Sequence, residues 1–289
     1  MIMNKSFYTQ YASFLDHFIS EALHEDIQDG DFSSLASFSK QTEGKLVLKL
    51  KESAIIAGVD LAEKIYSQYD NSIRLSIYAE DGVLAHAGDT VFSVEGSVQS
   101  LLATERLVLN CMQRMSGIAT LTHSLVQKVA HTPCKLLDTR KTTPNFRYPE
   151  KWAVLIGGGE NHRMGLFDMI MLKDNHVDFC GGIEPTLNKA FKYLNDNSLQ
   201  IPVIVETRSL KEVKECLSFP QLHRILLDNM SIELLQEAVA LVNGKIPTEA
   251  SGNITEKNLV AIAETGVNYA SLGALTHSAQ NIDMSLVTV

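Results

Sequence analysis

This chain has few cysteines and no long apolar run, the features that mark disulfide-bonded secreted proteins, zinc-binding proteins and membrane proteins. Its 289 residues include only four cysteines, Cys111, Cys134, Cys180 and Cys216, and no CxxC pair. Scattered cysteines argue against a disulfide framework or a thiolate zinc site and favour free thiols in a reducing compartment. No apolar run approaches the ~20 residues of a membrane span, and the first residues lack the apolar core of a signal peptide. We therefore expect a cytoplasmic protein that does not enter a membrane.

The charge balance excludes a further class of function. The chain has 34 acidic residues against 25 Lys and Arg, which gives a formal net charge of -9. A general nucleic-acid binder needs a basic face to neutralise phosphates, so we expect no nucleic-acid partner. Six Lys and Arg residues nevertheless fall between Arg140 and Lys173. They could form a local cationic pocket or a solvated surface of mixed charge.

The first part of the chain predicts a small α+β unit. An apolar stripe predicts a helix over residues 5–25, and short strands punctuated by glycine fill residues 45–96, with one helix over 59–68. A long helix is expected over 99–130. Within it, Gly117 indicates either a break or a close approach of another segment.

The second part alternates between strands and helices, which predicts a parallel sheet. The expected strands are 135–139, 169–173, 202–206, 224–228, 247–251 and 268–273, and the expected helices are 184–196, 209–217, 231–242 and 255–264. Ser209, Ser231 and Thr255 are the expected N-caps of the last three helices. A doubly wound sheet is possible, but the strand ends favour an open α/β barrel.

Each of these six strands ends in polar or charged residues or in glycine. The ends are Asp138 with Arg140, then Lys173, Glu206, Asp228, Ser251 with Gly252, and Gly273. In a parallel barrel, the carboxyl ends of the strands face one mouth, where active sites are built. We therefore expect these residues to converge, although they are far apart in the sequence.

The charges near the strand ends predict a site for a multiply anionic small molecule. The candidate cations are Arg140, Lys141, His162, Arg163 and Lys173. Arginine matches the fork geometry of carboxylates and phosphates, and lysine acts as a point charge. Glu206 and Asp228 follow neighbouring strands. They could bind ribose hydroxyls, coordinate Mg²⁺, stabilise a sugar cation or only cap loops.

Two glycine loops after the last strands are candidate phosphate sites. They are Ser251-Gly252-Asn253 and Leu272-Gly273-Ala274, with His277 just beyond the second. Backbone N–H groups at such loops bind phosphate, and barrels often place phosphate there. The run Gly157–Gly159 lacks the spacing of a dinucleotide fingerprint. We interpret it as flexible backbone that lets His162 and Arg163 approach the site. Residues 142–160 are a candidate for a mobile loop that closes the site.

Eight segments, taken in order, resemble one known family. They are HEDIQDGD, ATERLVLNCMQRMSGIAT, DTRKTTP, GGGENHRMGLFD, LKDNH, LLDNM, EASGNI and LGALTHS. Together they resemble the quinolinate phosphoribosyltransferases over about residues 21–278. DTRKTTP followed by GGGxNHR and KDNH is the most specific part of this resemblance.

The resemblance implies a two-domain enzyme. An N-terminal α/β sandwich over residues 1–112, joined by the C-terminal tail 277–289, would accompany an open α/β-barrel catalytic domain over 113–276. The implied reaction transfers phosphoribosyl from phosphoribosyl diphosphate to quinolinate, giving nicotinate mononucleotide, diphosphate and CO₂ for NAD biosynthesis. Mg²⁺ is the implied cofactor. The implied assembly is a homodimer or hexamer in which Arg106 reaches the neighbouring subunit's site.

The resemblance also implies roles for individual residues. Arg140, His162, Arg163 and Lys173 would hold the pyridine dicarboxylate, and Asp138 and Thr139 count among the substrate-binding residues. Lys141 would lie near phosphoribosyl diphosphate, with Glu206 and Asp228 facing the ribose and Mg²⁺. Ser251, Gly252, Asn253, Leu272, Gly273, Ala274 and His277 would hold the 5′-phosphate region.

Three positions depart from the family pattern, and two other functions stay open. Asn145-Phe146 stands where Gly-Leu is frequent, Asn253 where a second glycine is frequent, and Ile204 where an acid is frequent. Asn253 tolerates a positive φ, so its loop is still expected to form. A related phosphoribosyltransferase could use nicotinate or another anionic base, and a related protein could bind metabolites without catalysis.

Overall fold

The computed structural model describes residues 2–289, which form two compact units. The N-terminal unit runs to residue 123 and also contains residues 142–158 and 275–289. The barrel unit contains residues 124–141 and 159–274. The domain boundary predicted after residue 112 thus falls inside a helix of the N-terminal unit, and residues 142–158 pack within that unit. Among the described residues, no helix is long and apolar enough to cross a membrane.

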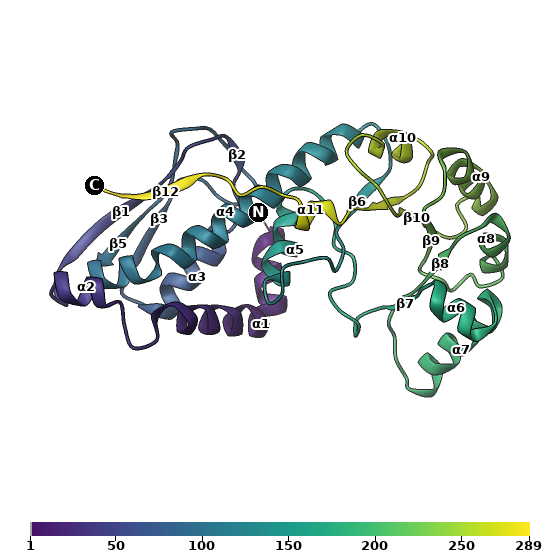
Figure 1. Ribbon diagram of the computed structural model, residues 1–289, viewed down its shortest axis with the longest axis horizontal. Helices are drawn as coiled ribbons and strands as arrows, with labels where there is room; N and C mark the ends of the chain where they lie inside the picture. The colour runs from purple at the N-terminus through teal and green to yellow at the C-terminus, as the bar shows by residue number, and fades with distance from the viewer. Residues whose placement is uncertain (1) are drawn as a thin grey trace. The chain divides into compact units, whose positions relative to one another are not determined.

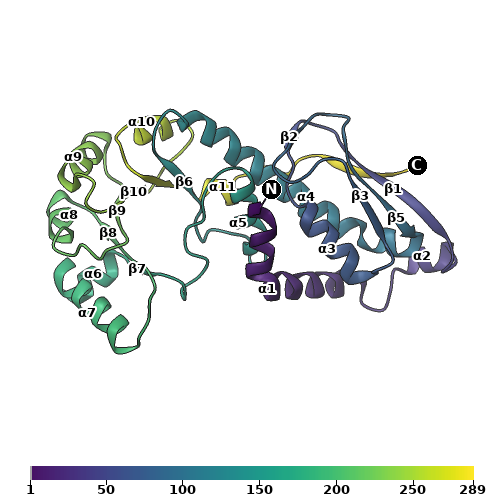
Figure 2. The ribbon, with the colours of Figure 1, turned by 180° about the vertical axis from the view of Figure 1, so that it is seen from behind.

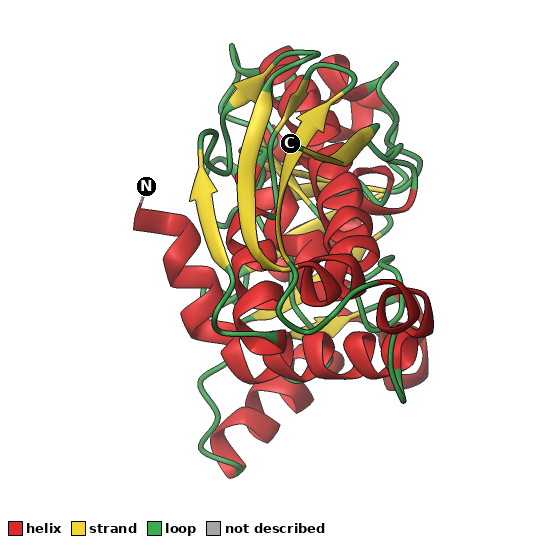
Figure 3. Ribbon diagram, turned by 90° about the vertical axis from the view of Figure 1, so that its left-hand side faces the viewer, coloured by secondary structure: helices red, strands yellow, loops and turns green. Residues whose placement is uncertain are grey.

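An antiparallel sheet organises the N-terminal unit. Its strand order is β12-β1-β5-β3, and Figure 3 shows its strands side by side. The elements of this unit are α1 (Ile2–Ile27), α2 (Phe32–Ser37), β1 (Glu43–Leu50), β2 (Ala54–Ile55), α3 (Val59–Tyr69), β3 (Arg74–Ile77), β4 (Leu84–Ala85), β5 (Thr90–Ser97), α4 (Val98–Val129), α5 (Arg147–Ile156), α11 (Ala274–His277) and β12 (Met284–Thr288). In β1, Leu48 and Leu50 are buried on either side of exposed Lys49, the alternation expected of a sheet with one covered face.

The C-terminal tail completes this sheet, because β12 pairs with β1. Helix α4 runs unbroken through Gly117, so the glycine marks a close approach and not a break. A Cβ at this position would collide with the backbone carbonyl of Gln280 in the tail. Gln113, one turn earlier in α4, bonds the tail through its side chain to the Met284 carbonyl at 3.1 Å.

Helix α5 lies inside the segment that was interpreted as a flexible loop. Trp152 is fully buried in it and stacks on Phe7, with ring centres 5.4 Å apart. A Cβ at Gly157 would run into Ala119 and Thr122 of α4. The glycine is therefore needed for close packing, and the interpretation of this position as flexible backbone was wrong.

The barrel unit contains a six-stranded parallel sheet with the order β6-β11-β10-β9-β8-β7. Its strands are β6 (Lys135–Leu137), β7 (Ile170–Leu172), β8 (Val203–Thr207), β9 (Arg224–Asp228), β10 (Thr248–Ser251) and β11 (Tyr269–Ser271). Its helices are α6 (Asp174–Cys180), α7 (Ile183–Asp196), α8 (Leu210–Cys216), α9 (Ile232–Val242) and α10 (Leu259–Ala263). The helices lie outside the curved run of strands (Figures 1 and 2). This is the predicted open α/β barrel, and all six predicted strands are present.

Two of the three predicted N-caps are confirmed. The Ser209 and Ser231 side chains accept hydrogen bonds from backbone N–H groups in the first turns of α8 and α9. Thr255 is not an N-cap, because α10 begins only at Leu259. Residues 255–258 form a turn instead, in which the Asn258 side chain accepts the Thr255 N–H at 2.7 Å.

Candidate active site

The barrel unit brings the predicted strand-end residues to one edge of its sheet. All six strands are parallel, so their carboxyl ends face the same way. Register places Ser251 beside Asp228 and Ser271 beside Leu137. Glu206 pairs with Leu226, two residues before Asp228. The strand ends therefore share one edge of the sheet, which we call the carboxyl edge. Their convergence on a single site stays a prediction.

Asp138, directly after β6, organises the segment that carries His162. It is fully buried. Its carboxylate accepts hydrogen bonds from the Asn161 side chain at 2.6 Å and from the His162 N–H at 2.8 Å. Both carboxylate oxygens are thus engaged by the protein. Asp138 therefore fixes the backbone of residues 161–162, and its role as a substrate ligand stays a prediction.

Arg163 follows directly and is only 9% exposed. Its N–H donates to His162 Nδ1 at 2.7 Å, which ties the two residues together. Burial and the nearby positive charge of Arg140 lower the pKa of Arg163, and Asp168 opposes them. The positive charges of these two groups repel each other, and burial weakens the screening by water. An anionic ligand would relieve that repulsion.

A buried charged group that the sequence analysis did not single out lies behind His162. Glu249, in β10, is fully buried and bonds Arg224 Nη1 at 2.6 Å. Its other carboxylate oxygen lies 3.4 Å from His162 Nε2. Burial alone would raise the pKa of Glu249, but His162 and Arg224 together hold it below its usual value. The sequence feature that could have revealed this group is a charged residue in the middle of the predicted strand segment Thr248-Glu249-Ala250.

Arg224 and His162 are both fixed by this group. The Arg224 guanidinium also stacks over the Tyr269 ring, 3.9 Å from its centre. His162 Nδ1 accepts the Arg163 N–H and its Nε2 faces Glu249, so both ring nitrogens point at protein groups. This geometry favours His162 as an orienting residue for Arg163 over a direct ligand of a carboxylate.

Lys173 and Glu206 lie at the ends of neighbouring strands and pair with each other. Lys173 Nζ is 3.0 Å from Glu206 Oε2. The lysine side chain is half exposed and the glutamate side chain is 8% exposed. The predicted carboxylate-binding cation and the predicted ribose-facing acid thus form an ion pair with each other.

Asp228 is the centre of a second polar group at this edge. Its carboxylate accepts the Ser251 hydroxyl and the Asn229 side-chain amide, each at 2.7 Å. The Asn253 side chain bonds Asn229 at 2.9 Å. Gly252 and Asn253 both have positive φ, +84° and +52°. The predicted tolerance of Asn253 for this conformation is confirmed, so the loop forms without a second glycine.

The remaining predicted residues of the barrel unit border the same edge. Arg140 and Lys141 are exposed, and the Lys141 N–H donates to Thr139 Oγ1 at 3.1 Å. Leu272 is buried and its N–H bonds the Leu137 carbonyl, so Gly273 and Ala274 directly follow the paired end of β11.

Two predicted residues belong to the N-terminal unit. Arg106 is exposed on α4 and lines a cavity together with Phe18, Glu25 and Phe146. His277 is exposed at the end of α11, where its ring lies 2.8 Å from the Ser278 hydroxyl. Neither residue takes part in the carboxyl-edge groups described above.

The donor set can be tested against a divalent cation. Within residues 2–289, no cluster of three or more His, Cys, Asp or Glu side chains is arranged to hold a metal ion. Glu206 and Asp228 supply two carboxylates from adjacent strands. Mg²⁺ commonly takes one or two carboxylates and completes its shell with water and substrate phosphates. The residues therefore fit a substrate-borne Mg²⁺ better than a permanent protein cage.

Comparison with known proteins assigns the family. Models of the N- and C-terminal domains of quinolinate phosphoribosyl transferase match residues 31–116 and 118–287. Quinolinate phosphoribosyltransferase (decarboxylating) 1b from Nicotiana tabacum is 46% identical over 93% of this chain and 80% of its own length. The probable nicotinate-nucleotide pyrophosphorylase (carboxylating) of Bacillus subtilis is 38% identical, over 96% of this chain and 93% of its own.

A solved structure agrees with these matches. The crystal structure of NadC from Streptococcus pyogenes has a TM-score of 0.89 and 36% identity, and the match covers 98% of both chains. The two domain models, the sequence relatives and this shared fold together cover almost the whole chain. The chain belongs to the quinolinate phosphoribosyltransferase family.

Proposed function

We propose that this chain transfers phosphoribosyl from phosphoribosyl diphosphate to quinolinate and releases diphosphate and CO₂, giving nicotinate mononucleotide. Family membership supports the reaction. The observation that supports it at the site is the presence of two guanidinium groups, Arg140 and Arg163, at the carboxyl edge, near enough for the charge of Arg140 to lower the pKa of Arg163. A pyridine with two adjacent carboxylates matches two neighbouring guanidinium groups in charge and in hydrogen-bonding geometry.

Quinolinate would bind on the Arg140, Arg163 and Lys173 side of the edge. Arg163 is preset by its backbone bond to His162, which Asp138 and Glu249 hold in turn. A preset guanidinium loses little freedom when it binds a carboxylate in a forked pair. Lys173 would leave Glu206 to pair with the incoming dianion.

Phosphoribosyl diphosphate would bind on the Asp228 side. The loop Ser251-Gly252-Asn253 offers backbone N–H groups for the 5′-phosphate, and Gly273-Ala274 continues this surface. Lys141 would face the diphosphate. Glu206 and Asp228 would hold Mg²⁺, which supplies charge neutralisation for the leaving diphosphate.

The chain's own residues act by positioning and electrostatics. The pyridine nitrogen forms a bond to the anomeric carbon of the ribose while the bond from that carbon to the diphosphate oxygen breaks. Glu206 and Asp228 stabilise the positive charge that develops on the ribose, and Lys141 stabilises the departing diphosphate. The ring nitrogen, now cationic, stabilises the electron pair that the breaking ring–carboxylate bond leaves on C2. CO₂ is released, and C2 takes a proton from solvent water to give nicotinate mononucleotide.

The site is proposed to be shared between subunits of a dimer or a larger assembly, with Arg106 entering the neighbouring subunit's site. Two inactive variants, Arg106→Ala and Lys173→Met, test this arrangement. Mixing them under conditions of subunit exchange creates some sites that lack both substitutions, so activity is expected to return. No recovery, with mixed assemblies confirmed by mass, would show that each site is built from one chain.

The proposed compartment is the cytoplasm. All four cysteines are free thiols and three of them are buried, which suits a reducing environment.

An end-point assay tests the reaction itself. Purified protein receives Mg²⁺, phosphoribosyl diphosphate and either quinolinate or nicotinate, and nicotinate mononucleotide and CO₂ are measured. Product and CO₂ from quinolinate alone are expected, and Arg140→Ala is expected to lower kcat/KM at least tenfold, or ~1.4 kcal/mol. Product from nicotinate alone would overturn the choice of substrate. No product from either, with binding retained, would indicate a non-catalytic relative.

A further inference from the structure

Helix α6 carries Lys173 at its amino end but is weakly held by apolar packing. It has seven residues, Asp174–Cys180, and only Val177 among them is buried. Phe179 is 91% exposed. Gly181 and Gly182 follow with φ of +89° and +124°, so the chain leaves the helix in a conformation that favours glycine. Such a short helix gains little stability by itself, and contacts with its neighbours must place it.

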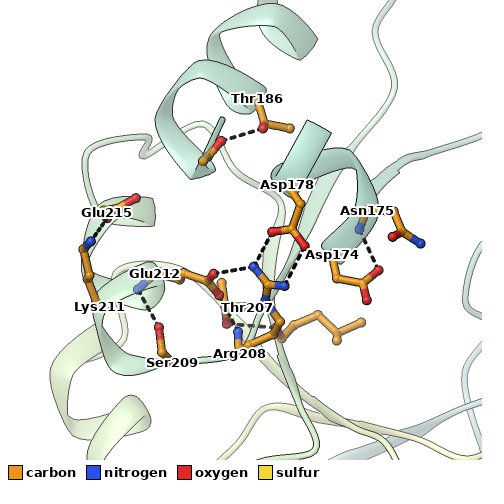
Figure 4. A network of polar contacts seen from close by, with 12 residues as sticks. Asp174, Asn175, Asp178, Thr186, Thr207, Arg208, Ser209, Lys211, Glu212 and Glu215 are labelled. Atoms are coloured by element: carbon orange, nitrogen blue, oxygen red, sulfur yellow. Dashed lines mark hydrogen bonds and ion pairs between the residues drawn. The ribbon is translucent and has the colours of Figure 1, made fainter. Parts of the chain in front are cut away.

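The main polar tie to the next βα unit is an ion pair between Asp178 and Arg208. Arg208 lies in the loop between β8 and α8. Its Nη1 and Nη2 reach the two oxygens of Asp178 at 3.0 and 2.7 Å (Figure 4). A forked pair of this kind fixes both distance and orientation, which a single surface contact does not.

Arg208 is also held by hydrogen bonds within its own βα unit, independently of α6. Glu212, in the first turn of α8, accepts the Arg208 backbone N–H at 2.6 Å and its Nη2 at 3.0 Å (Figure 4). The Glu212 N–H in turn donates to Ser209, the N-cap of α8. Hydrogen bonds to Asp178 and Glu212 raise the pKa of Arg208 further above its usual value. The guanidinium is therefore a fixed, charged anchor on the β8 unit.

Two ion pairs connect the segment that contains α6 with the β8 unit: an inner pair in the site and an outer pair that includes Arg208. Arg208 follows Glu206 by two residues, and Asp178 follows Lys173 by five. The inner pair, Lys173 with Glu206, must open when a dianionic substrate draws Lys173 away. The outer pair of Asp178 with Arg208 then remains to hold α6 against the β8 unit.

We propose that Arg208 is a positioning residue for quinolinate, which through Asp178 holds α6 and so keeps Lys173 at the carboxyl edge when substrate binds. The inference rests on the proposed function for its substrate. It assigns Arg208 no contact with either substrate. The consequence is expected to fall mainly on quinolinate, because Lys173, at the amino end of α6, is assigned to quinolinate.

The test uses the full-length protein and two independent readouts. Arg208→Gln, Asp178→Asn and the double variant are compared with Lys192→Gln, which breaks an exposed ion pair with Asp196 on α7 of the same unit. Hydrogen exchange of the peptide covering residues 174–180 reports how firmly α6 is held. Steady-state kinetics report KM for quinolinate and for phosphoribosyl diphosphate separately.

The expected result is faster exchange in α6 and a quinolinate KM raised about threefold to tenfold in Arg208→Gln and Asp178→Asn, with kcat and the other KM within about twofold. The double variant is expected to be no worse than either single variant, because both remove the same pair. Arg208→Lys keeps the positive charge but cannot form the two-pronged contact with Asp178. Its exchange rate in α6 and its quinolinate KM are expected to lie between those of wild type and Arg208→Gln.

Unchanged exchange in α6 would overturn the inference, as would equal increases in both KM values or the same effect in Lys192→Gln. Wild-type protein that turns over no quinolinate would overturn the proposed function. The exchange measurement would still decide in that case whether Arg208 holds α6, so the two failures are distinguishable.

Discussion

Lys173 Nζ lies 3.0 Å from Glu206 Oε2, so a cation proposed for quinolinate and an acid proposed for the ribose are paired with each other. Each residue is 33 positions from the other in sequence, at the ends of adjacent parallel strands. One positive and one negative charge of the site thus neutralise each other. If Lys173 binds a quinolinate carboxylate as proposed, it has to exchange its contact with Glu206 for one with that carboxylate.

Glu206→Gln is expected to separate binding from catalysis. Loss of the carboxylate frees Lys173 and removes a negative charge beside a dianionic ligand, so quinolinate should bind more tightly. The same change removes a group that stabilises the developing ribose cation, so kcat should fall at least ~tenfold. Calorimetry gives the quinolinate Kd, and steady-state kinetics give kcat. Asp196→Asn is the control, and weaker quinolinate binding in Glu206→Gln would contradict the idea.

Glu249→Gln is expected to destabilise the barrel unit. The change leaves Arg224, whose side chain is 7% exposed, without its charged partner. Removing one member of a buried ion pair typically costs ~3–5 kcal/mol, whereas replacing both by apolar residues recovers much of the loss. Urea unfolding should show a large decrease in the free energy of unfolding for Glu249→Gln. The decrease should be smaller for the double variant Arg224→Met/Glu249→Met.

The control for that experiment is Glu95→Gln, which breaks an exposed ion pair with Lys45. Its cost should stay below ~1 kcal/mol. If Glu249→Gln and Glu95→Gln lowered the free energy of unfolding equally, the buried carboxylate would not have the structural role described above.

Gly117→Ala tests whether the tail contact outweighs helix propensity. In a free helix, alanine is more favourable than glycine by about 1 kcal/mol. Here its Cβ would collide with the Gln280 carbonyl, so the variant should be less stable and β12 should exchange its amide hydrogens faster. Gln127→Ala, at an exposed position of the same helix, should cause no loss. A more stable Gly117→Ala protein would show that the tail can move aside.

Asp81→Asn tests the pH dependence of the N-terminal unit. Asp81 accepts the Val59 N–H at the start of α3 at 2.9 Å. Burial raises the pKa of Asp81 from 3.8 to about 7, although its hydrogen bonds act in the opposite direction. The folded protein therefore binds this proton more tightly than the unfolded chain does. That stabilisation is complete below pH ~4 and is lost as the pH rises through ~7.

Asparagine carries no charge over this range, so Asp81→Asn should flatten the decline of stability between pH ~5 and ~8. Relative to wild type, the variant should gain stability as the pH rises. Urea unfolding at several pH values measures the slope, with Asp196→Asn as the control. Equal slopes in wild type and Asp81→Asn would assign the pH dependence to other groups.

Much of the fold was predictable because its signals are local. The six barrel strands and the caps Ser209 and Ser231 follow from apolar runs and from single residues beside them. Helix α5 was missed because the glycine run that follows it was interpreted as flexible backbone. This helix is stabilised by the burial of Trp152 against Phe7. Residues next to Trp152 in the sequence do not indicate that contact.

The sequence by itself determined the fold class, the strand ends and most of the charged residues that reach the carboxyl edge. These depend on the period of apolar residues and on where each strand stops. Only the tertiary structure decided that Glu249 lies behind His162, that Lys173 pairs with Glu206 and that Arg208 holds Asp178. Such pairs are set by strand order and register, which bring together residues that are distant in the chain.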